Sequence, residues 1–488
     1  MSIFQVTTEI APIAKVGGLA DVVYGLSKEL VSTGHDLKII LPYYDFLKTK
    51  KLREPKIICK SKFSCSSHIT IPVTYYETKL EDLQLILVKA GDKDNSFNRG
   101  SIYGQMDDSY RFLLFLYLTM HYFETCEKPS LIHLHDWPTS FLAYLYKCDA
   151  MENSPLDPKI VLTLHNMLHQ GRTSKKPFEK LGVECSHMFN DDKLIDQNNP
   201  TLLNLLKAGI SYADSITTVS PTYSEEIQTR EFGYALDGAL IQKKNVLTGI
   251  LNGIDLNYWN PNKDDTLKKE FPSTFQFEKI IKAKKANREK LQTMFKMKES
   301  KSPLFCTVSR LDTQKGPELI EHAITFSLDK GAQFFLLGSA SDPLVKKQFE
   351  KLHEKNKTNP NFHMSGVFDE DVARLVYAAA DFIVIPSNFE PCGLTQMIAM
   401  RYFCIPIVRK TGGLADSVVD IDQDSVKAVE RVGFVFESKD KHDMEQCIER
   451  ALALYLDKES YEEILSNHAL QDFSWERSAK AYLKIYGK

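Results

Sequence analysis

The sequence has no excess of charge of one sign and no apolar run long enough to span a membrane. Its 61 lysines and arginines are balanced by 64 aspartates and glutamates, which gives a net charge of −3. This balance argues against nucleic acid or an anionic membrane as the main partner, although it allows local basic clusters around a phosphorylated small molecule. The apolar stretch 110–123 has only 14 residues, too few to cross a bilayer, and predicts a buried helix.

Paired-cysteine motifs are also absent. The nine cysteines are odd in number and scattered, and no two of them form a C-x-x-C pair. They are Cys59, Cys65, Cys126, Cys148, Cys185, Cys306, Cys392, Cys404 and Cys447. This pattern predicts reduced thiols in a cytoplasmic protein. The N-terminus runs directly into a predicted strand, so no signal peptide is expected.

The sequence does contain a regular alternation of predicted strands and helices. At 488 residues it is too long for one hydrophobic core and suits two domains. The alternation is typical of α/β proteins, in which helices cover both faces of a parallel sheet. Short apolar runs predict strands at 3–6, 37–41, 130–134, 159–164 and 214–219, then at 304–308, 333–337, 361–365, 382–385 and 404–408.

Turn signals in residues 251–261 mark a break between the two halves of the chain. We therefore expect an N-terminal domain at 1–250 and a second domain at 251–488, with a last helix near 472–486 that can pack back on the first. Three stretches are expected outside the sheets. They are a basic irregular connection at 48–62, a polar surface excursion at 171–199, and an exposed helical stretch, rich in Lys and Glu, that ends at 301.

A glycine loop follows the first predicted strand. Residues 15–23 read KVGGLADVV, and the glycine pair precedes a helical pattern. Gly17 and Gly18 let the backbone approach a ligand, the helix start offers N–H groups, and Lys15 adds a cation suited to a diphosphate. The alternative is a simple tight turn. Because residues 410–418 repeat the pattern as KTGGLADSV, we expect two similar domains, each with a glycine loop at the carboxyl end of its sheet.

Cations and a carboxylate follow two strands of the second half. Arg310 and Lys315 lie in SRLDTQKG, where they can neutralise a leaving diphosphate without a metal ion. The alternative is a solvated loop. Glu390 begins the loop EPCGLT and can bind sugar hydroxyls, or it can simply cap a helix. The amides that follow it open a helix and can bind phosphate; they belong to Cys392, Gly393, Leu394 and Thr395.

Histidines and an acid follow two strands of the first half. His133 and His135 in HLHDW have the spacing of a metal pair, but no third or fourth ligand with a recognisable spacing accompanies them, so no metal is predicted. Asp136 is the preferred cleft carboxylate of this segment. His165 ends the next strand, where it is either structural or part of the same cleft.

Seven motifs in order along the chain resemble the bacterial glycogen synthase and plant starch synthase family. They are KVGGLADVV, HLHDW, TLHNMLHQG, LNGID, VSRLDTQKG, PSNFEPCGLTQ and KTGGLAD. Members of that family are retaining glycosyltransferases of GT-B architecture, with two Rossmann-like domains facing an interdomain cleft. The resemblance implies transfer of glucose from ADP-glucose, or alternatively UDP-glucose, to the non-reducing end of glycogen or another α-1,4-glucan, with no cofactor.

The resemblance also implies roles for individual residues. Lys15 and the amides of Gly17 and Gly18 would hold the donor diphosphate and the acceptor sugar, and Arg310 and Lys315 would stabilise the departing nucleotide. Glu390 would grip the transferred glucose. The remaining implied roles are His165 beside the reacting glucose, Asp136 near the acceptor, Tyr103 on the acceptor, Phe368 against the nucleotide base, and Asn252 with the amides of Cys392, Gly393, Leu394 and Thr395 on the donor.

Three positions depart from the family pattern. The loop NRGSIYG at 98–104 has Asn98 in place of an acid and lacks the family's proline, although Tyr103 matches. Val16 replaces a threonine, and Phe368 replaces a tyrosine, which keeps stacking but loses a hydroxyl. The alternatives are a catalytically silent glucan-binding homologue, a glycosyltransferase with another donor or acceptor, and a double displacement through two carboxylates instead of the family's front-face attack.

Overall fold

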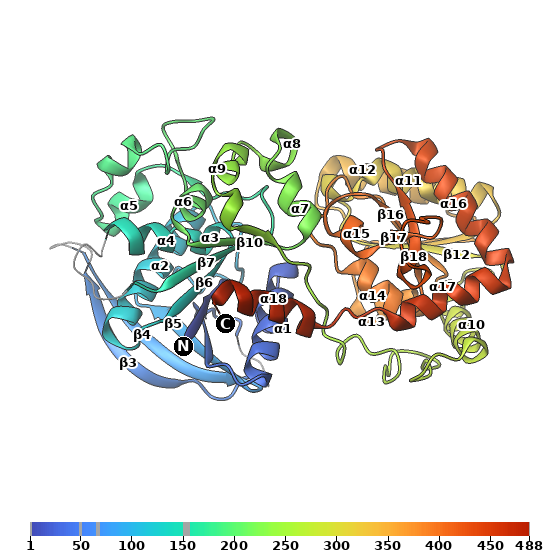
Figure 1. Cartoon of the computed structure of the whole chain (residues 1–488), viewed down its shortest axis with the longest axis horizontal. Helices are drawn as coiled ribbons and strands as arrows, with labels where there is room; N and C mark the ends of the chain where they lie inside the picture. Colours follow the sequence, from blue (N-terminus) through green and yellow to red (C-terminus); the bar gives the residue numbers. More distant parts are fainter. Residues whose placement is uncertain (1, 48–50, 65–68, 150–156, 488) are drawn as a thin grey trace. The chain divides into compact units, whose positions relative to one another are not determined.

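The computed structural model describes residues 2–47, 51–64, 69–149 and 157–487. The chain divides into two compact units. Unit 1 consists of Met1–Gly253 together with Trp475–Lys488, and unit 2 consists of Ile254–Ser474. Each unit is built on its own mainly parallel sheet with helices packed against it (Figure 1).

The sheet of unit 1 has nine strands in the order β11-β10-β7-β6-β1-β2-β5-β4-β3. β4 is antiparallel to both of its neighbours, and the other described pairings in this sheet are parallel. The strands are β1 (Ile3–Val6), β2 (Leu37–Pro42), β3 (Lys56–Ser64), β4 (Thr70–Leu80), β5 (Leu83–Ala90), β6 (Leu131–His135), β7 (Lys159–Leu164), β10 (Ser215–Thr218) and β11 (Leu247–Gly249). A separate two-stranded pairing joins β8 (Arg172–Thr173) to β9 (Leu203–Asn204).

The helices of unit 1 include one that comes from the far end of the chain. They are α1 (Gly18–Ser32), α2 (Asp108–Thr125), α3 (Trp137–Ser140), α4 (Leu142–Tyr144), α5 (Lys176–Leu181), α6 (Leu205–Tyr212), α7 (Pro221–Glu226), α8 (Arg230–Gly233), α9 (Asp237–Gln242) and α18 (Trp475–Tyr486). α18 lies beside α1 (Figure 1). A Cβ atom on Gly25 of α1 would lie 2.0 Å from the indole nitrogen of Trp475, so this glycine makes room for the C-terminal helix.

The sheet of unit 2 has seven parallel strands in the order β14-β13-β12-β15-β16-β18-β17. They are β12 (Leu304–Val308), β13 (Gln333–Leu337), β14 (Phe362–Ser365), β15 (Phe382–Ile385), β16 (Ile405–Arg409), β17 (Val419–Asp420) and β18 (Arg431–Phe436). Its helices are α10 (Phe277–Met294), α11 (Pro317–Asp329), α12 (Pro343–Lys355), α13 (Glu370–Ala379), α14 (Thr395–Arg401), α15 (Gly412–Ser417), α16 (Lys441–Leu456) and α17 (Lys458–Leu470).

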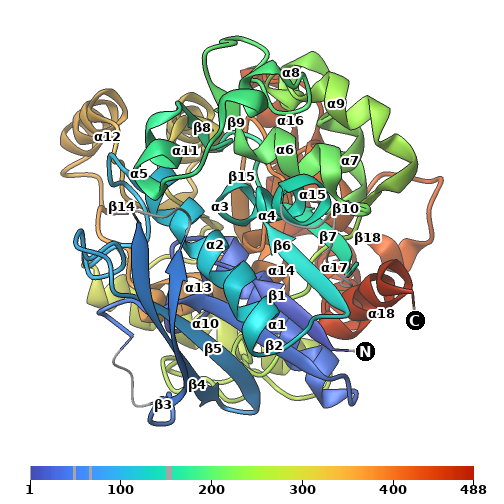
Figure 2. The same cartoon turned by 90° about the vertical axis from the view of Figure 1, so that its left-hand side faces the viewer.

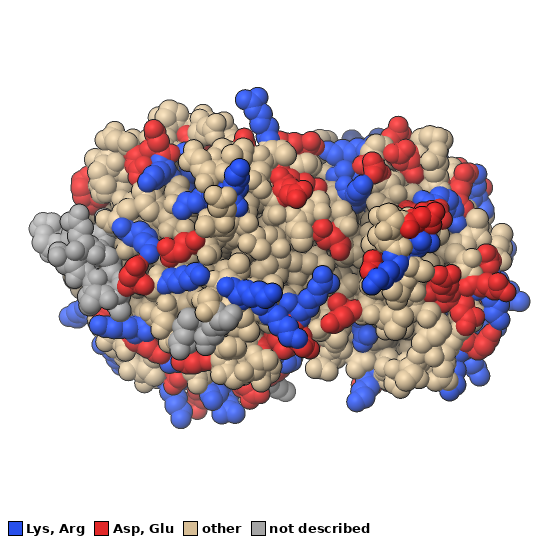
Figure 3. Space-filling view, viewed as in Figure 1, with Lys and Arg blue, Asp and Glu red and all other residues tan. Residues whose placement is uncertain are grey.

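The predicted elements are largely confirmed. The strands expected at 3–6, 159–164, 304–308, 333–337 and 382–385 have the observed bounds, and the others differ by one or two residues. The apolar stretch 110–123 lies within α2, whose residues are mostly buried, as expected. No helix in the described part of the chain has the length and apolar character that crossing a bilayer requires. Basic and acidic side chains are intermixed over the face seen in Figure 3, as expected from their balanced numbers.

The prediction of an irregular connection at 48–62 was wrong. Residues 48–50 lie outside the described residues, but Lys56–Ser64 forms β3, the outermost strand of the sheet in unit 1 (Figure 2). Its alternate residues face outward as exposed positions, several of them lysines. Lysine on an edge strand discourages pairing with a second chain. The lysines also interrupt the apolar run, so the strand could not be recognised from apolar residues alone.

The helix expected before residue 301 is present as α10, but it is only half exposed. Two of its basic side chains are buried. Lys284 Nζ donates to the carbonyl oxygens of Ala380 and Phe403 at 2.6 and 2.9 Å, and Arg288 pairs with Asp381. The carbonyl of Ala380 follows the last turn of α13, where the helix dipole is negative. Burial of these cations is therefore matched by acceptors that the sequence pattern does not reveal.

Candidate active site

Both sheets place candidate site residues at a point where the strand order reverses. In unit 1 the chain moves from β1 to β2 on one side and later returns to β6 on the other. In unit 2, β12 lies between β13 and β15 in the same way. Loops at the carboxyl ends of such strand pairs diverge and leave a crevice where ligands bind in open α/β sheets. The segments that begin at Thr7, His165, Ser309 and Pro386 all follow the carboxyl ends of their strands.

Glu9 organises the glycine loop of unit 1. One carboxylate oxygen accepts the amides of Val16 and Gly17 at 2.7 and 3.0 Å, and the other accepts the hydroxyl of Tyr103 at 2.8 Å. The side chain is buried. Glu9 thus ties the glycine loop to the Tyr103 loop, and the Gly17 amide is already bonded within the chain. Gly18 remains exposed, with open space where a Cβ would stand.

Lys15 lies beside this loop on the surface. Its ammonium group pairs with Asp21 of α1 at 2.8 Å, and its side chain is 42% exposed. An exposed ion pair of this kind is worth at most about 1 kcal/mol, so it opposes capture of an incoming phosphate only weakly.

The three histidines of unit 1 form one buried stack. His133 bonds Tyr486 Oη and Thr163 Oγ1 at 2.8 and 2.6 Å. The rings of His133 and His135 lie 4.3 Å apart, and His135 Nδ1 is 3.1 Å from His165 Nε2. Among the described residues, no group of three or more His, Cys, Asp and Glu side chains is placed to hold a metal ion.

Asp136 joins the ends of β6 and β7. Its carboxylate accepts the backbone amide of His165 at 2.6 Å, and its own backbone has φ 56°, in the left-handed region. Such a backbone conformation is uncommon for a residue other than glycine and often marks a functional site. Burial raises the pKa of Asp136 to about 7, whereas the same burial lowers the pKa of His165 to about 3. The site therefore holds a neutral imidazole beside a carboxyl group that titrates near neutral pH.

These pKa shifts predict how the stability of unit 1 depends on pH. Burial holds His133 and His165 at a pKa of about 3 and lowers the pKa of His135 well below 6.5. Near pH 5 all three are neutral when folded and protonated when unfolded. Asp136 acts in the opposite sense, because its folded pKa of about 7 exceeds its ordinary value of 3.8. Its stabilising contribution is full below pH 3.8 and is lost as pH rises through 7.

When the protein unfolds near pH 5, the three histidines should therefore bind three protons from solvent and Asp136 should release one. The net uptake by these four groups is about two protons. We expect the unfolding free energy to rise between about pH 4 and 6.5, as measured by denaturant titration at several pH values. His133→Gln should remove about one proton from this slope, while His442→Gln, at a side chain 71% exposed, should not change it. An unchanged slope in His133→Gln would contradict the assignment.

In unit 2 a lysine and a glutamate meet at the reversal point of the sheet. Lys315 Nζ lies 2.5 Å from Glu390 Oε2, and the hydroxyl of Ser387 donates to the same oxygen at 2.9 Å. The side chain of Lys315 is 18% exposed and that of Glu390 is 7% exposed. Arg310 is separate from this pair: its side chain is 72% exposed, and its nearest acid is Asp312 at 3.6 Å. Of the two predicted cations, Lys315 is therefore held in place by an ion pair, whereas Arg310 lies on the surface.

A short helical turn fixes Lys315. The Asp312 side chain accepts the Lys315 amide at 3.2 Å and caps this turn. Gly316 follows with φ 68°, and a Cβ at this position would lie 2.4 Å from the carbonyl oxygen of Pro386. The glycine therefore lets the Lys315 turn pack directly on the loop that carries Glu390.

The second glycine pair lies at the carboxyl end of β16, as expected, but unlike the first pair it is closely packed. Gly412 and Gly413 are buried, whereas Gly18 is exposed. A Cβ on Gly412 would lie 2.0 Å from the carbonyl oxygen of Glu390, and one on Gly413 would lie 2.0 Å from that of Cys392. The same Gly-Gly sequence thus has a different structural role in each unit. The first pair leaves open space beside the backbone, and the second allows two backbone segments to pack in direct contact.

This contrast predicts different outcomes for the same substitution. Gly413→Ala should lower the stability of unit 2 by about 1–3 kcal/mol or more, because the methyl group has to displace the backbone at Cys392. Gly18→Ala should leave the melting temperature nearly unchanged, because nothing lies within 4 Å of the added atom. Calorimetry of both variants checks this. If the two variants had equal melting temperatures, the backbone around Gly413 would accommodate a methyl group and the prediction would be wrong.

The remaining predicted residues differ in exposure. Phe368 follows β14 and is 56% exposed, so it is not a core residue. Asn252 is buried, and its side-chain oxygen has no hydrogen-bond partner in the described part of the chain. Gly393 has φ 70°, and Leu394 is the residue just before α14, whose first residue is Thr395. Cys392 is buried.

The fold and the site together define a class of protein. The two Rossmann-like sheets have the GT-B architecture, and the family models that match them make this chain a glycosyltransferase. A family model described as starch synthase catalytic domain matches residues 2–242, and one described as glycosyl transferases group 1 matches residues 289–469.

Known relatives cover the whole chain. Glycogen synthase of Protochlamydia amoebophila (strain UWE25) is 36% identical over 493 residues, with 100% of this chain and 99% of the relative aligned. Glycogen synthase 2 of Methylococcus capsulatus is 37% identical, with 99% of each chain aligned. The catalytic domain of starch synthase IV from Arabidopsis thaliana, solved with ADP and acarbose bound, has a TM-score of 0.92 and 36% identity over 100% of this chain and 98% of that one. The chain belongs to the glycogen and starch synthase family.

Proposed function

We propose that this glycosyltransferase moves glucose from ADP-glucose to the non-reducing end of an α-1,4-glucan such as glycogen, with retention of configuration. The observation that carries the proposal is the Lys315–Glu390 pair, held at the reversal point of a Rossmann-like sheet. It supplies a cation for a leaving phosphate next to an acid for sugar hydroxyls. A related starch synthase that binds ADP supports adenine as the base of the donor.

The leaving group is the centre of the proposed mechanism. In unit 2, Lys315 and Arg310 neutralise the diphosphate as the bond between it and the glucose C1 breaks. The family resemblance implies a diphosphate contact for Lys15 as well. Preorganised charge of this kind, in a site that excludes water, is a large contributor to enzymatic rate. Phe368, with its exposed ring, stacks on the base, and the amides of residues 392–395 bind phosphate or sugar oxygens.

The acceptor reaction follows on the same face of the sugar. The 4-hydroxyl of the glucan end attacks C1, and its proton passes to the departing phosphate oxygen. Neutral His165 and the Asn252 side-chain oxygen bond sugar hydroxyls, Tyr103 and Asp136 lie on the acceptor side, and Glu390 holds the transferred glucose. Each role follows from the family resemblance and from the position of the residue at a strand end.

The test is an assay of the whole chain with glycogen and, in separate reactions, ADP-glucose, UDP-glucose and GDP-glucose. We expect release of ADP together with α-1,4-linked glucose, identified by NMR of the product. Faster turnover with UDP-glucose would overturn the donor assignment. Binding of glycogen without release of any nucleotide would favour a catalytically silent homologue. The eight free cysteines in the described part of the chain suit the reducing cytoplasm that we propose as its location.

A further inference from the structure

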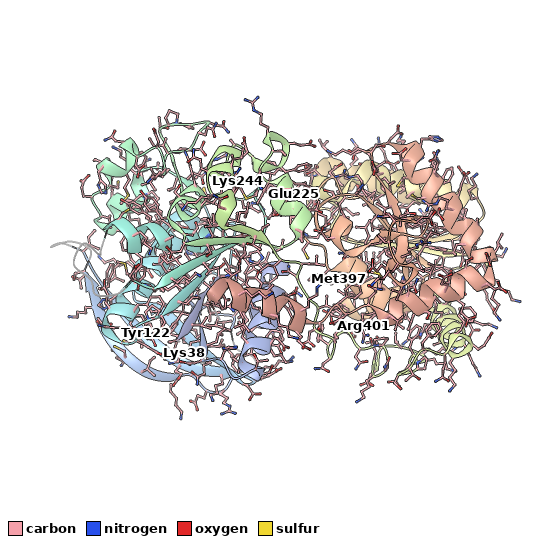
Figure 4. The ribbon with its side chains drawn as sticks, viewed as in Figure 1. Lys38, Tyr122, Glu225, Lys244, Met397 and Arg401 are labelled. Carbon is pink, nitrogen blue, oxygen red and sulfur yellow. The ribbon has the colours of Figure 1, made fainter. Side chains whose placement is uncertain are left out.

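A cavity lies in unit 1, away from the candidate active-site residues. Its volume is about 420 Å³, and its lining includes Lys38, Tyr122, Glu127, Cys59 and Cys126. Lys38 is near the start of β2, and Glu127 follows the C-terminal end of α2. The cavity is therefore at the amino end of the sheet, whereas the candidate active site follows the carboxyl ends. Figure 4 shows Lys38 and Tyr122 close together in this region.

The two cysteines in this cavity come from elements that face each other. Alternate residues of β3, Cys59, Ser61 and Phe63, are the less exposed ones and turn toward α2. The hydroxyl of Ser61 lies 2.8 Å from His121 Nε2, and the ring of Phe63 lies 6.0 Å from that of Tyr117. Two residues of strand and about four residues of helix span similar lengths.

Moving two residues back along β3, from Ser61 to Cys59, corresponds to moving about four residues forward along α2, from His121 to the end of the helix. Cys126 follows the last residue of that helix, and its amide bonds the carbonyl of Tyr122 at 2.8 Å. Cys59 and Cys126 both line this cavity, and both cysteines are free. Cys126 is exposed, so small molecules reach it from solvent.

We propose that Cys59 and Cys126 form a redox-active dithiol site, which a two-electron oxidant of the hydrogen peroxide class converts into a disulfide between β3 and the end of α2. One thiolate attacks a peroxide oxygen, the O–O bond breaks, and a sulfenic acid and one water result. The second thiol then attacks the sulfenic sulfur, so that the S–S bond forms, the S–O bond breaks and a second water leaves. The two thiols lose two electrons and two protons, and peroxide gains them.

The surroundings of the pair set the conditions for this reaction. Lys38 is bonded to both oxygens of Glu127 at 2.6 Å, so the cation in the cavity is already neutralised. Burial raises the pKa of Cys126, with a smaller upward contribution from Cys59 and a downward one from the Thr125 hydroxyl. Since the thiolate is the nucleophile, oxidation should become faster as pH rises above neutral.

The test treats the whole reduced protein with hydrogen peroxide at pH 8, blocks remaining thiols by alkylation, and maps peptides by mass spectrometry. We expect loss of two thiols per chain, a peptide pair joined through Cys59 and Cys126, and full reversal by dithiothreitol. The oxidised chain should also melt higher, on the order of 5 °C, because the bond closes a long loop.

Matched variants separate this site from general thiol oxidation. Cys126→Ser should abolish the joined peptide, while Cys148→Ser, at another exposed cysteine, should leave it unchanged. The unmodified chain gives the decisive peptide map even where a variant folds poorly. Sulfinic acid at Cys126 without a bond to Cys59, a bond to any other cysteine or between chains, or no loss of thiols would overturn the proposal.

Discussion

Lys315→Ala should lower kcat by about 10²–10³-fold, the largest loss that we expect from any single substitution in this chain. The lysine is held by a capped turn and by Glu390, so its charge is already in place before the leaving group develops negative charge. A group that needs no reorganisation during the reaction acts mainly on the transition state. The donor KM should therefore change much less than kcat, measured from initial rates of ADP release.

A matched lysine provides the control for this prediction. Lys330 also pairs with a glutamate, Glu449, at 2.7 Å, but on the exposed surface of the same unit. Lys330→Ala should keep full activity. A loss of kcat in Lys315→Ala that is matched by unfolding, as judged by calorimetry, would argue for a structural lysine, and unchanged turnover would remove the proposed role of charge altogether.

Glu390→Gln should produce the second largest loss, about 10²-fold in kcat. The substitution keeps the size of the side chain and its contact with Ser387, but it removes the charge that holds Lys315 at 2.5 Å. Lys315 then loses its fixed position, and the sugar hydroxyls lose a charged acceptor. Glu437→Gln is the control, because Glu437 is 75% exposed and pairs with a surface lysine, Lys410.

The double variant tests whether the pair acts as one unit. If Glu390 works mainly by positioning Lys315, then Lys315→Ala combined with Glu390→Gln should lose little more activity than Lys315→Ala alone. Losses that multiply would instead assign the two residues independent roles, with Glu390 acting on the sugar. Either result requires that the melting temperatures of the three variants stay close to that of the unmodified chain.

The positions of the site residues were predictable because they follow apolar strands. Arg310, Lys315 and Glu390 each lie in a loop that leaves a strand of a parallel sheet, and such loops meet at one edge. The contact between Lys315 and Glu390 was not predictable, because 75 residues separate them and only the packing of their two loops brings them together. The same holds for Ser387, which lies in the motif PSNFEPCGLTQ but was given no role there.

Glu9 shows what sequence reasoning missed and how it could have been found. It is the third residue after the first strand, close to the strand-end position that drew attention to Asp136 and His165. Its partners are two backbone amides and the Tyr103 hydroxyl. Hydrogen bonds to backbone amides cannot be predicted from the sequence, because almost every residue has such an amide. The two glycine pairs illustrate the converse. Identical letters at 17–18 and 412–413 differ in burial because their surroundings differ.

The path of the chain between its units has a practical consequence. The amide of Ile254 bonds the carbonyl of Phe473 at 2.8 Å, so the first and last residues of unit 2 lie together. Nearby, the hydroxyl of Ser478 bonds the carbonyl of Leu251 at 2.6 Å. Residues 254–474 thus form a continuous insertion whose two ends adjoin, the arrangement in which an inserted segment can be exchanged for another without stretching the chain that receives it.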